Sequence, residues 1–207
     1  MSTRDFDARA ATWDDDPAKV ERAQAIAAAI VREVPLAAGM RALEYGCGTG
    51  LLSFALRSHF AAITMADVSE GMLSVANAKI DAAGGRDQLE AIKLDLLVDP
   101  APRQRFDIIY SAMTLHHIPD TEAILRRFHE QLVRSGVLCI ADLDTEDGSF
   151  HGAGFDGHLG FDRATLTAQA LNAGFAKVRF TTAFEMHKKV NGREHAFPVF
   201  LMVAGTA

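Results

Sequence analysis

The stretch Leu43-Glu44-Tyr45-Gly46-Cys47-Gly48-Thr49-Gly50 decides the fold of this 207-residue chain. An apolar strand pattern over residues 41–45 runs directly into three alternating glycines, and an apolar helix pattern begins at Leu51. Glycine permits positive φ angles and leaves the backbone bare, so a ligand can approach the main chain closely. The stretch therefore predicts a strand, a ligand-binding turn and a helix in direct succession.

Strand and helix patterns alternate along the rest of the chain. Further strands are expected over residues 62–66, 89–94, 107–111, 137–143, 177–185 and 196–204. Helices are expected from Asp14–Pro17 to Val34 and over residues 51–57, 70–83, 121–134 and 163–173. The last two strands flank Asn191-Gly192, a strong hairpin signal. Strands joined by helices predict an α/β fold, a three-layer sandwich around a seven-stranded, mostly parallel sheet with an antiparallel final strand.

The composition is that of one globular domain. Hydrophobic residues make up 49% of the chain and charged residues 23%, which is too apolar and too balanced for a disordered protein. The longest nearly apolar run, residues 23–31, is too short to cross a membrane, and the N-terminus lacks the order of a secretion signal. We therefore expect a cytoplasmic protein without a membrane partner. The net charge of −6 disfavours nucleic acid as a partner.

Acidic side chains mark the ends of three predicted strands. Glu44 lies beside the glycine turn, Asp67 ends the second strand and Asp95 ends the third. The carboxyl ends of parallel strands meet at one edge of a sheet, where ligands bind. A nicotinamide dinucleotide would need a glycine where Leu51 stands, and Glu44 would repel its phosphates. A cofactor with a cationic sulfonium and amino group, S-adenosylmethionine, suits this acidic rim better.

The ordered motifs resemble those of the class I S-adenosylmethionine-dependent methyltransferases over nearly the whole chain. The segments that carry the likeness are residues 44–50, 65–69, 95–96, 106–118, 136–138 and 171–175. The resemblance implies a Rossmann-like fold, S-adenosylmethionine as methyl donor and S-adenosylhomocysteine as product. Residues 111–114, Ser-Ala-Met-Thr, lack the Asn/Asp-Pro-Pro-aromatic tetrapeptide of methyltransferases that act on nucleic-acid amino groups. A small-molecule acceptor is therefore expected.

The resemblance also implies where the methionine and ribose parts of the cofactor lie. The methionine part would cross Gly46 and Gly48, with Cys47 as a small loop residue between them. Glu44 would act on the amino group, and the Ser111 carbonyl would face the methionine end. Asp67 would accept protons from both ribose hydroxyls, an arrangement that suits a carboxylate.

The adenine contacts and a lid follow from the same resemblance. Asp95 would accept from the adenine amino group while the backbone N–H of Leu96 donates to the ring. Val68 and Met72 would enclose the purine. In similar small methyltransferases the segment before the first strand folds over the cofactor. We therefore expect one domain over residues 1–207, in which residues 1–38 form a lid that carries Trp13 and residues 39–207 form the cofactor-binding core.

Four histidines fall in connections at the same edge of the predicted sheet. His116 and His117 follow the fourth strand, and His151 and His158 follow the fifth. Histidine is suited to accept a proton from an acceptor near neutral pH. We expect at least one of the four to be catalytic, although polar loops also accommodate histidine without a function. A Mg²⁺ site formed by Asp142, Asp144, Glu146, Asp147 and His151 is the less favoured interpretation, and no metal is expected.

Two other functions remain open from the sequence. A non-catalytic S-adenosylmethionine-binding protein, acting as a sensor or as the partner of an active subunit, would keep the same cofactor motifs. A nicotinamide oxidoreductase is disfavoured by Leu51 and Asp95. Neither the acceptor atom nor the oligomeric state follows from the sequence.

Overall fold

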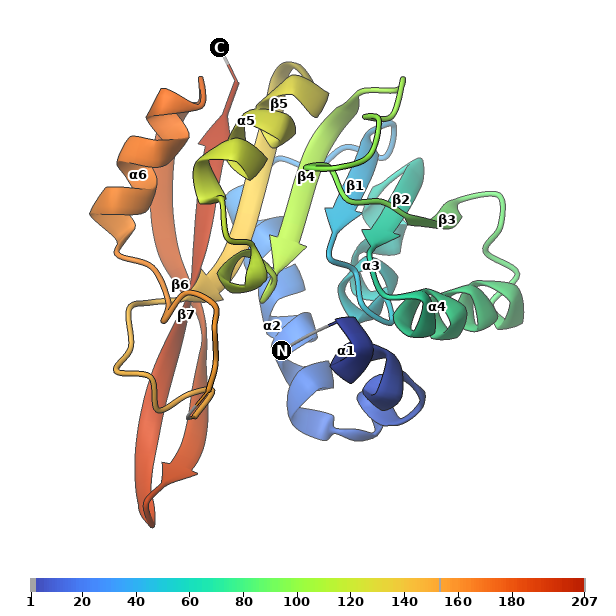
Figure 1. Cartoon of the computed structure of the whole chain (residues 1–207). Coiled ribbons are helices and arrows are strands. Elements are labelled where there is room, and N and C mark those ends of the chain that lie inside the picture. The colour runs from blue at the N-terminus through green and yellow to red at the C-terminus, as the bar shows by residue number, and fades with distance from the viewer. Residues whose placement is uncertain (1–2, 153, 207) are drawn as a thin grey trace.

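The structure is a computed structural model that describes residues 3–152 and 154–206; residues 1, 2, 153 and 207 of the expected domain lie outside the described residues (Figure 1). One sheet has the strand order β3-β2-β1-β4-β5-β7-β6. Its strands are β1 (Arg41–Tyr45), β2 (Ala62–Asp67), β3 (Leu89–Lys93), β4 (Phe106–Ala112), β5 (Leu132–Leu143), β6 (Ala176–Val190) and β7 (Arg193–Gly205). Strands β1 to β5 pair in parallel and β7 is antiparallel to both its neighbours, which confirms the predicted fold class.

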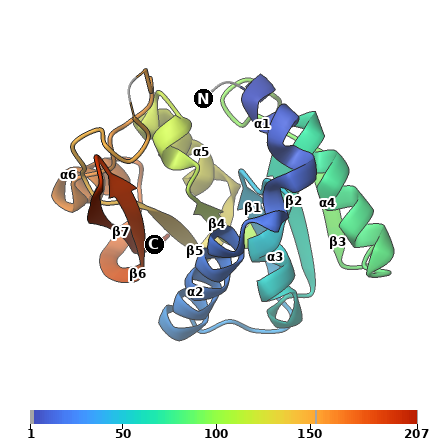
Figure 2. The same cartoon turned by 90° about the horizontal axis from the view of Figure 1, so that it is seen from below.

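Helices cover both faces of the sheet (Figure 2). One face packs against α2 (Pro17–Glu33), α3 (Leu51–Leu56) and α4 (Glu70–Ala82), and the other against α5 (Thr121–Gln131) and α6 (Arg163–Asn172). Neighbouring strand residues point to opposite faces, so Ala42 of β1 joins the first core and Leu43 the second. No helix in the described part of the chain has the length and apolarity needed to cross a bilayer.

Two elements precede the first predicted helix. They are α1 (Thr3–Arg9) and the 3-10 helix η1 (Ala10–Asp15), and Asp16 then caps α2 by accepting from the backbone N–H of Ala18 at 3.0 Å. Ala10 is the one buried residue of α1 and η1, and the other side chains of these two elements are exposed or half-buried. Without a buried apolar stripe, the periodicity used for the other helices could not predict them.

The helix predicted to reach Arg134 ends earlier, at Gln131. Leu132 is extended (φ −82°, ψ 148°), is buried and pairs with Phe106, so β5 begins there. The pairing register then shifts between Phe106 and Ile108, and Ser135 has a φ of 64°. The intervening residues form an irregular extended segment, which has no period-two pattern and therefore resembles a helix end in sequence.

The final hairpin extends beyond the carboxyl edge of the sheet (Figure 1). Pairing of β5 with β7 stops at Leu143 and Val199, whereas β6 and β7 continue to pair with each other as far as Val190 and Arg193. The outer hairpin consequently stands beside the β5–α6 loop, at the edge where a parallel sheet binds its ligands.

Candidate functional site

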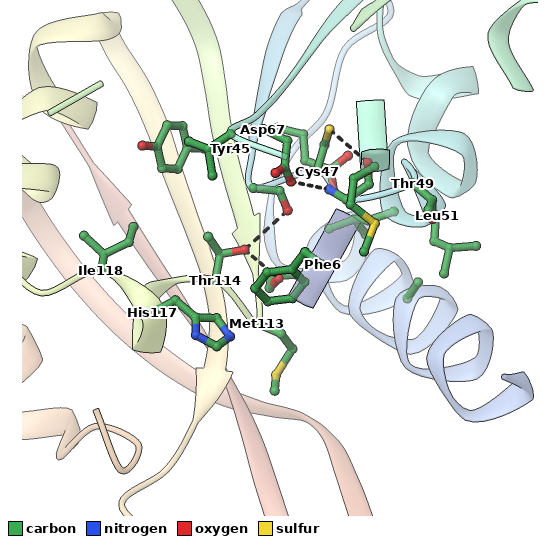
Figure 3. Close-up of a pocket in the computed structure, with 18 of the residues that line it drawn as sticks. Phe6, Tyr45, Cys47, Thr49, Leu51, Asp67, Met113, Thr114, His117 and Ile118 are labelled. Atoms are coloured by element: carbon green, nitrogen blue, oxygen red, sulfur yellow. Dashed lines mark hydrogen bonds between the residues drawn. The ribbon is translucent and has the colours of Figure 1, made fainter. Parts of the chain in front are cut away.

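A cavity of about 280 Å³ opens at the carboxyl edge of the sheet (Figure 3). Its lining comes from the segments after β1, β2, β3 and β4 together with α1, η1 and α2. The residues expected from the sequence that line it are Trp13, Glu44, Gly46, Cys47, Gly48, Asp67, Val68, Met72, Asp95 and His117. The cavity thus brings together ten of the fifteen expected residues, and Leu96, Ser111, His116, His151 and His158 lie outside the lining.

The turn after β1 requires glycine at positions 46 and 48 for different reasons. Both have positive φ, 73° at Gly46 and 53° at Gly48. A Cβ at Gly46 would lie 2.3 Å from the side chain of Thr114, so this glycine lets the turn pack against the segment after β4. A Cβ at Gly48 would meet only the Met72 sulfur, at 4.0 Å, and would occupy space on the cavity side. Gly48 is therefore where bare backbone is presented to a ligand.

The carboxylate of Asp67 is held in place by backbone donors. One oxygen accepts from the N–H of Gly48 at 2.7 Å and the other from the N–H of Ser69 at 2.9 Å. Burial raises the pKa of Asp67, against the opposing effect of these donors. Each carboxylate oxygen has a second lone pair, so the group can also accept two hydroxyl protons from a diol in the cavity.

Asp95 is linked to a tyrosine that sequence reasoning missed. An Asp95 oxygen accepts from the Leu97 N–H at 2.9 Å and lies 3.4 Å from the Tyr45 hydroxyl. The N–H of Leu96, expected to face a purine ring, donates to the same hydroxyl at 3.3 Å. Tyr45 lines the cavity as the last residue of β1. Its place in a buried strand pattern gave no signal of this polar contact.

Glu44 is buried beneath the glycine turn. Its carboxyl accepts from the Ser53 N–H at 3.1 Å and from the Ser53 hydroxyl, which lies 2.8 Å from the Tyr110 hydroxyl. Burial raises the pKa of Glu44 to about 8, so the group is mostly protonated at pH 7. A cation bound beside it would favour the ionised form.

The N-terminal segment is fastened over the cavity at its α1 end by Asp7. The carboxylate accepts from the Ser69 hydroxyl at 2.6 Å and from the Gly71 N–H at 2.9 Å, at the start of α4. A Cβ at Gly71 would lie 2.8 Å from the Asp7 Cα, so glycine is needed for this close approach. Phe6, next to Asp7, lines the cavity and contacts the ring of His117 with centroids 5.3 Å apart.

A second fastening involves Asp14 of η1. Its carboxylate accepts from the Thr49 hydroxyl of the glycine turn and, at 2.6 Å, from the Lys79 ammonium of α4. Trp13 lies beside it in the cavity wall, with the Lys19 ammonium 4.0 Å from its ring centroid. These contacts hold η1 against the turn after β1.

Arg22 of α2 is a cavity cation that the sequence interpretation missed. It lines the cavity with Lys19, and its guanidinium donates to the Met186 sulfur at 3.3 Å. A thioether is a weak acceptor, so this guanidinium retains donor capacity toward a ligand. Burial lowers the pKa of Arg22 from its ordinary value. The only sequence signal was an arginine beside the apolar stripe of α2.

Three of the four candidate histidines come together. His117 faces the cavity (Figure 3). Its ring centroid lies 4.2 Å from that of His116 and 5.9 Å from that of His151. Burial lowers the pKa of His117 to about 3 and that of His151 to about 4, so both rings are neutral at pH 7. His116 is buried, and its Nδ1 lies 2.6 Å from the Asp142 carboxylate.

The side chains of His158 and Ser111 point elsewhere, and the carbonyl of Ser111, the group expected to face the cofactor, stays a prediction. The Nε2 of His158 lies 3.0 Å from the Ile118 carbonyl and 3.3 Å from the Thr121 hydroxyl, which ties the β5–α6 loop to the start of α5. The Ser111 hydroxyl donates to the Tyr45 carbonyl at 2.7 Å. Both side chains connect segments around the site without lining it.

The acidic residues after β5 do not form a cluster of ligands. The Asp144 carboxylate pairs with the Arg163 guanidinium at 2.7 Å, and Asp142 faces His116. Across residues 3–152 and 154–206, no three His, Cys, Asp or Glu side chains are arranged to hold a metal ion.

Comparison with known proteins finds a family profile described as a methyltransferase domain, which matches residues 43–138. The chain is 30% identical over 161 residues to the ubiquinone biosynthesis O-methyltransferase of Azorhizobium caulinodans, covering 70% of this chain and 62% of that protein. It is 29% identical over 132 residues to the 27-O-demethylrifamycin SV methyltransferase of Amycolatopsis mediterranei, covering 63% of this chain and 48% of that protein. The chain thus spans about half to three fifths of the length of these relatives.

Among solved structures, an S-adenosylmethionine-dependent methyltransferase of Thermotoga maritima superposes with a TM-score of 0.71. The alignment covers 98% of both chains at 16% sequence identity. At that identity the likeness is one of fold. It extends to the N-terminal segment and the final hairpin as well as the central sheet.

Proposed function

Because the chain belongs to the class I S-adenosylmethionine-dependent methyltransferases, we propose that it transfers a methyl group from S-adenosylmethionine to a hydroxyl group of a small molecule. The observation that carries this proposal is the cavity in which the bare backbone of Gly48 adjoins the carboxylates of Asp67 and Asp95. The relatives whose printed names specify O-methyl transfer support oxygen as the acceptor atom. A cytoplasmic location and the lack of a nucleic-acid partner stay predictions.

The charges around the cavity suit the cofactor. Bound S-adenosylmethionine supplies an activated methyl group on a positively charged sulfur. Asp67 binds the ribose hydroxyls, and Asp95 accepts from the adenine amino group. Arg22 pairs with the methionine carboxylate, because the Met186 sulfur is a weak acceptor that leaves donor capacity on the guanidinium. Glu44 ionises beside the amino group, whose positive charge adds to that of Lys79 and offsets the burial of the acid.

The acceptor enters between the segment after β4 and the N-terminal segment. Phe6, Met113 and His117 line this part of the cavity, so an apolar or aromatic molecule with one hydroxyl fits its character. We propose that residues 1–38 act as the lid of the core formed by residues 39–207, because Asp7 and Asp14 fasten the segment over the cavity. Closure excludes water from the sulfonium and aligns the two reactants.

Calorimetry and a transfer assay test the proposal. S-adenosylhomocysteine should bind the wild-type protein with one site per chain, and Asp67→Asn should weaken binding at least tenfold through the loss of charge-assisted hydrogen bonds. Asp81→Asn is the matched control, because Asp81 is exposed at the far end of α4 and pairs with Arg86. Methyl-labelled S-adenosylmethionine with phenols, catechols and hydroxyquinones should then give labelled ethers. Absence of binding by the wild type would refute the proposal.

A non-catalytic cofactor-binding protein is the second candidate, and the pKa of His117 favours it. A ring that holds its proton only below about pH 3 is a poor base on its own. Tight binding of S-adenosylhomocysteine with no labelled product from any acceptor class would support this second function.

A further inference from the structure

The Tyr45 hydroxyl has a position that the proposed function leaves unexplained. It donates to an Asp95 carboxylate oxygen at 3.4 Å and accepts from the Leu96 backbone N–H at 3.3 Å. These are the two groups expected to bind the edge of adenine, Asp95 as acceptor and Leu96 as donor. An adenine edge offers an amino donor beside a ring-nitrogen acceptor, so the phenol meets the two partners with the same pair of roles. The hydroxyl therefore belongs to the adenine part of the site.

The sheet brings the Tyr45 side chain to this place. Tyr45 of β1 pairs with Ala66 of β2, and Ala66 pairs with Ile92 of β3, so the three residues lie in one row across the strands. All three belong to the second core. Because Ala66 carries only a methyl group, no larger side chain of β2 in this row separates the tyrosine from the segment after β3. Phe128 of α5 packs on the tyrosine ring, with centroids 5.2 Å apart, and holds it in place.

The segment after β3 is organised by short-range contacts of its own. An Asp95 oxygen accepts from the Leu97 N–H at 2.9 Å, and the Asp95 N–H donates to the Asp99 carboxylate at 2.8 Å. This segment follows an edge strand, since β3 stands at the end of the strand order. The Tyr45 hydroxyl adds a polar link from the segment to β1, which has neighbours on both sides. That link acts on the two groups that would face adenine.

The direction of this link is fixed. Burial raises the pKa of Tyr45 well above its ordinary value, and Asp95 raises it further, so the phenol keeps its proton. A carboxylate can only accept, so the hydroxyl proton points to Asp95 and an oxygen lone pair faces the Leu96 N–H. Both contacts are longer than an optimal hydrogen bond. Asp95 and the Leu96 N–H therefore keep the capacity for shorter bonds to a ligand.

We propose that Tyr45 is a positioning residue that sets the specificity of the site for adenine, by holding Asp95 as acceptor and the Leu96 N–H as donor toward the purine edge. The inference rests on the proposed function. The adenine amino group donates to Asp95 and the ring N1 takes the Leu96 N–H, while the Tyr45 hydroxyl stays on Asp95. Hypoxanthine presents a carbonyl and an N–H in the reverse order, so it leaves both protein groups unpaired.

Calorimetry with two ligands tests this role. They are S-adenosylhomocysteine and S-inosylhomocysteine, in which hypoxanthine replaces adenine. The wild type should bind the adenine ligand about 100-fold or more tightly than the hypoxanthine ligand. Tyr45→Phe retains the ring, and its preference for adenine should fall about fivefold or more, mainly through weaker binding of S-adenosylhomocysteine.

Tyr110→Phe is the matched control, because Tyr110 is the other tyrosine of the chain. Its hydroxyl lies in the first core, 2.8 Å from that of Ser53, so the adenine preference of this variant should stay within about twofold of the wild type. A merely structural loss would weaken both ligands alike and leave the preference unchanged. A smaller change in Tyr45→Phe, an equal change in Tyr110→Phe, or a wild type without the preference would overturn the proposal. Failure of the wild type to bind S-adenosylhomocysteine would count against the proposed function instead.

A double-mutant cycle tests whether Tyr45 acts through Asp95. Asp95→Ala removes the acceptor that the hydroxyl holds in place. Adding Tyr45→Phe to Asp95→Ala should therefore change the adenine preference by no more than about twofold, which is less than its effect on the wild type. A larger effect in the absence of Asp95 would mean that the hydroxyl acts on the purine itself, and the positioning role would be rejected.

Discussion

The carboxyl edge of the sheet is built in two ways. In the cofactor half, at the ends of β1, β2 and β3, Gly48, Asp67 and Asp95 line the cavity from positions at or just after their own strands. In the acceptor half, at the ends of β4 and β5, His117 lines the cavity but depends on His116, Asp142 and the β5–α6 loop behind it. The first half is therefore local in construction, whereas the second is assembled by tertiary contacts.

The difference predicts how each half responds to change. A group fixed by its own strand end keeps its position when distant segments are altered, so single substitutions in the cofactor half should affect binding directly. A group supported through several contacts responds to substitutions that never touch the ligand. Four experiments probe this distinction, beginning with the largest expected effect.

The two glycines of the β1 turn provide the sharpest test of the cofactor half. Gly48→Ala should weaken S-adenosylhomocysteine binding by about 100-fold or more, because the added methyl occupies space where the ligand meets the backbone. Its effect on folding should be modest, about 1–2 kcal/mol for a non-glycine residue in the left-handed region. Calorimetry and thermal melting measure the two quantities separately.

Gly46→Ala is the matched comparison. A methyl there would lie 2.3 Å from Thr114, so thermal stability should fall clearly further than in Gly48→Ala. If the two variants lost affinity and stability in the same proportion, the assignment of Gly48 to the ligand and Gly46 to packing would be wrong.

Removal of residues 1–15 tests whether the N-terminal segment belongs functionally to the cofactor half. Trp13 and Phe6 would no longer cover the cavity, so S-adenosylhomocysteine affinity should fall about 10- to 100-fold, the value of burying one or two large apolar side chains. The core should stay folded because Asp16 still caps α2. Circular dichroism checks the fold and calorimetry the affinity; unchanged affinity would contradict a lid.

The same distinction explains what the sequence could predict. Gly46, Gly48, Asp67 and Asp95 were found because each stands beside a strand end that periodicity locates, and strand ends of a parallel sheet converge. The pairing of His116 with Asp142 joins residues 26 apart, and Arg22 meets Met186 across 164 positions. Such pairings depend on packing, which one sequence does not reveal. The sequence predicted that four histidines lie at this edge. It did not predict that one lines the cavity, that two lie behind it and that one lies apart.

Glu44, the buried acid of the cofactor half, should make the stability of the protein depend on pH. The pKa of Glu44 is about 8 in the folded protein against 4.5 in the reference state, so only the folded form holds this proton between those values. Its stabilising effect is complete below about pH 4.5 and is lost as the pH rises toward 8. Between pH 7 and pH 8 the free energy of unfolding should therefore fall by about 1 kcal/mol.

Glu44→Gln should remove that slope, because it keeps the shape of the side chain without the titration. Thermal melting at pH 7.0, 7.5 and 8.0 measures the difference. This window avoids His117 and His151, whose lowered pKa values have the opposite effect: they reduce stability as the pH falls below about 6.5. A parallel pH dependence in both proteins would show that Glu44 does not titrate there.

The smallest expected effect concerns the contacts that join the final hairpin to the β5–α6 loop of the acceptor half. The Lys188 ammonium of β6 donates to the Phe150 carbonyl at 2.6 Å and lies 4.6 Å from the Phe150 ring centroid. Contacts of this kind at exposed sites contribute about 0–1 kcal/mol, so Lys188→Met should shift the melting temperature by only a few degrees. The β5–α6 loop should nevertheless open more often, because these contacts join it to the hairpin.

Hydrogen exchange can detect that local opening where melting cannot. Amides of residues 146–152 should exchange several-fold faster in Lys188→Met than in the wild type, while those of β1 and β2 stay unchanged. Lys189→Met is the control, since neighbouring residues of a strand point to opposite faces. Because His151 belongs to the loop and contacts His116, faster exchange there should accompany lower turnover with unchanged S-adenosylhomocysteine affinity. Equal exchange in the two lysine variants would mean that the loop keeps its place without the hairpin, and the acceptor half would then be less dependent on distant contacts than its geometry indicates.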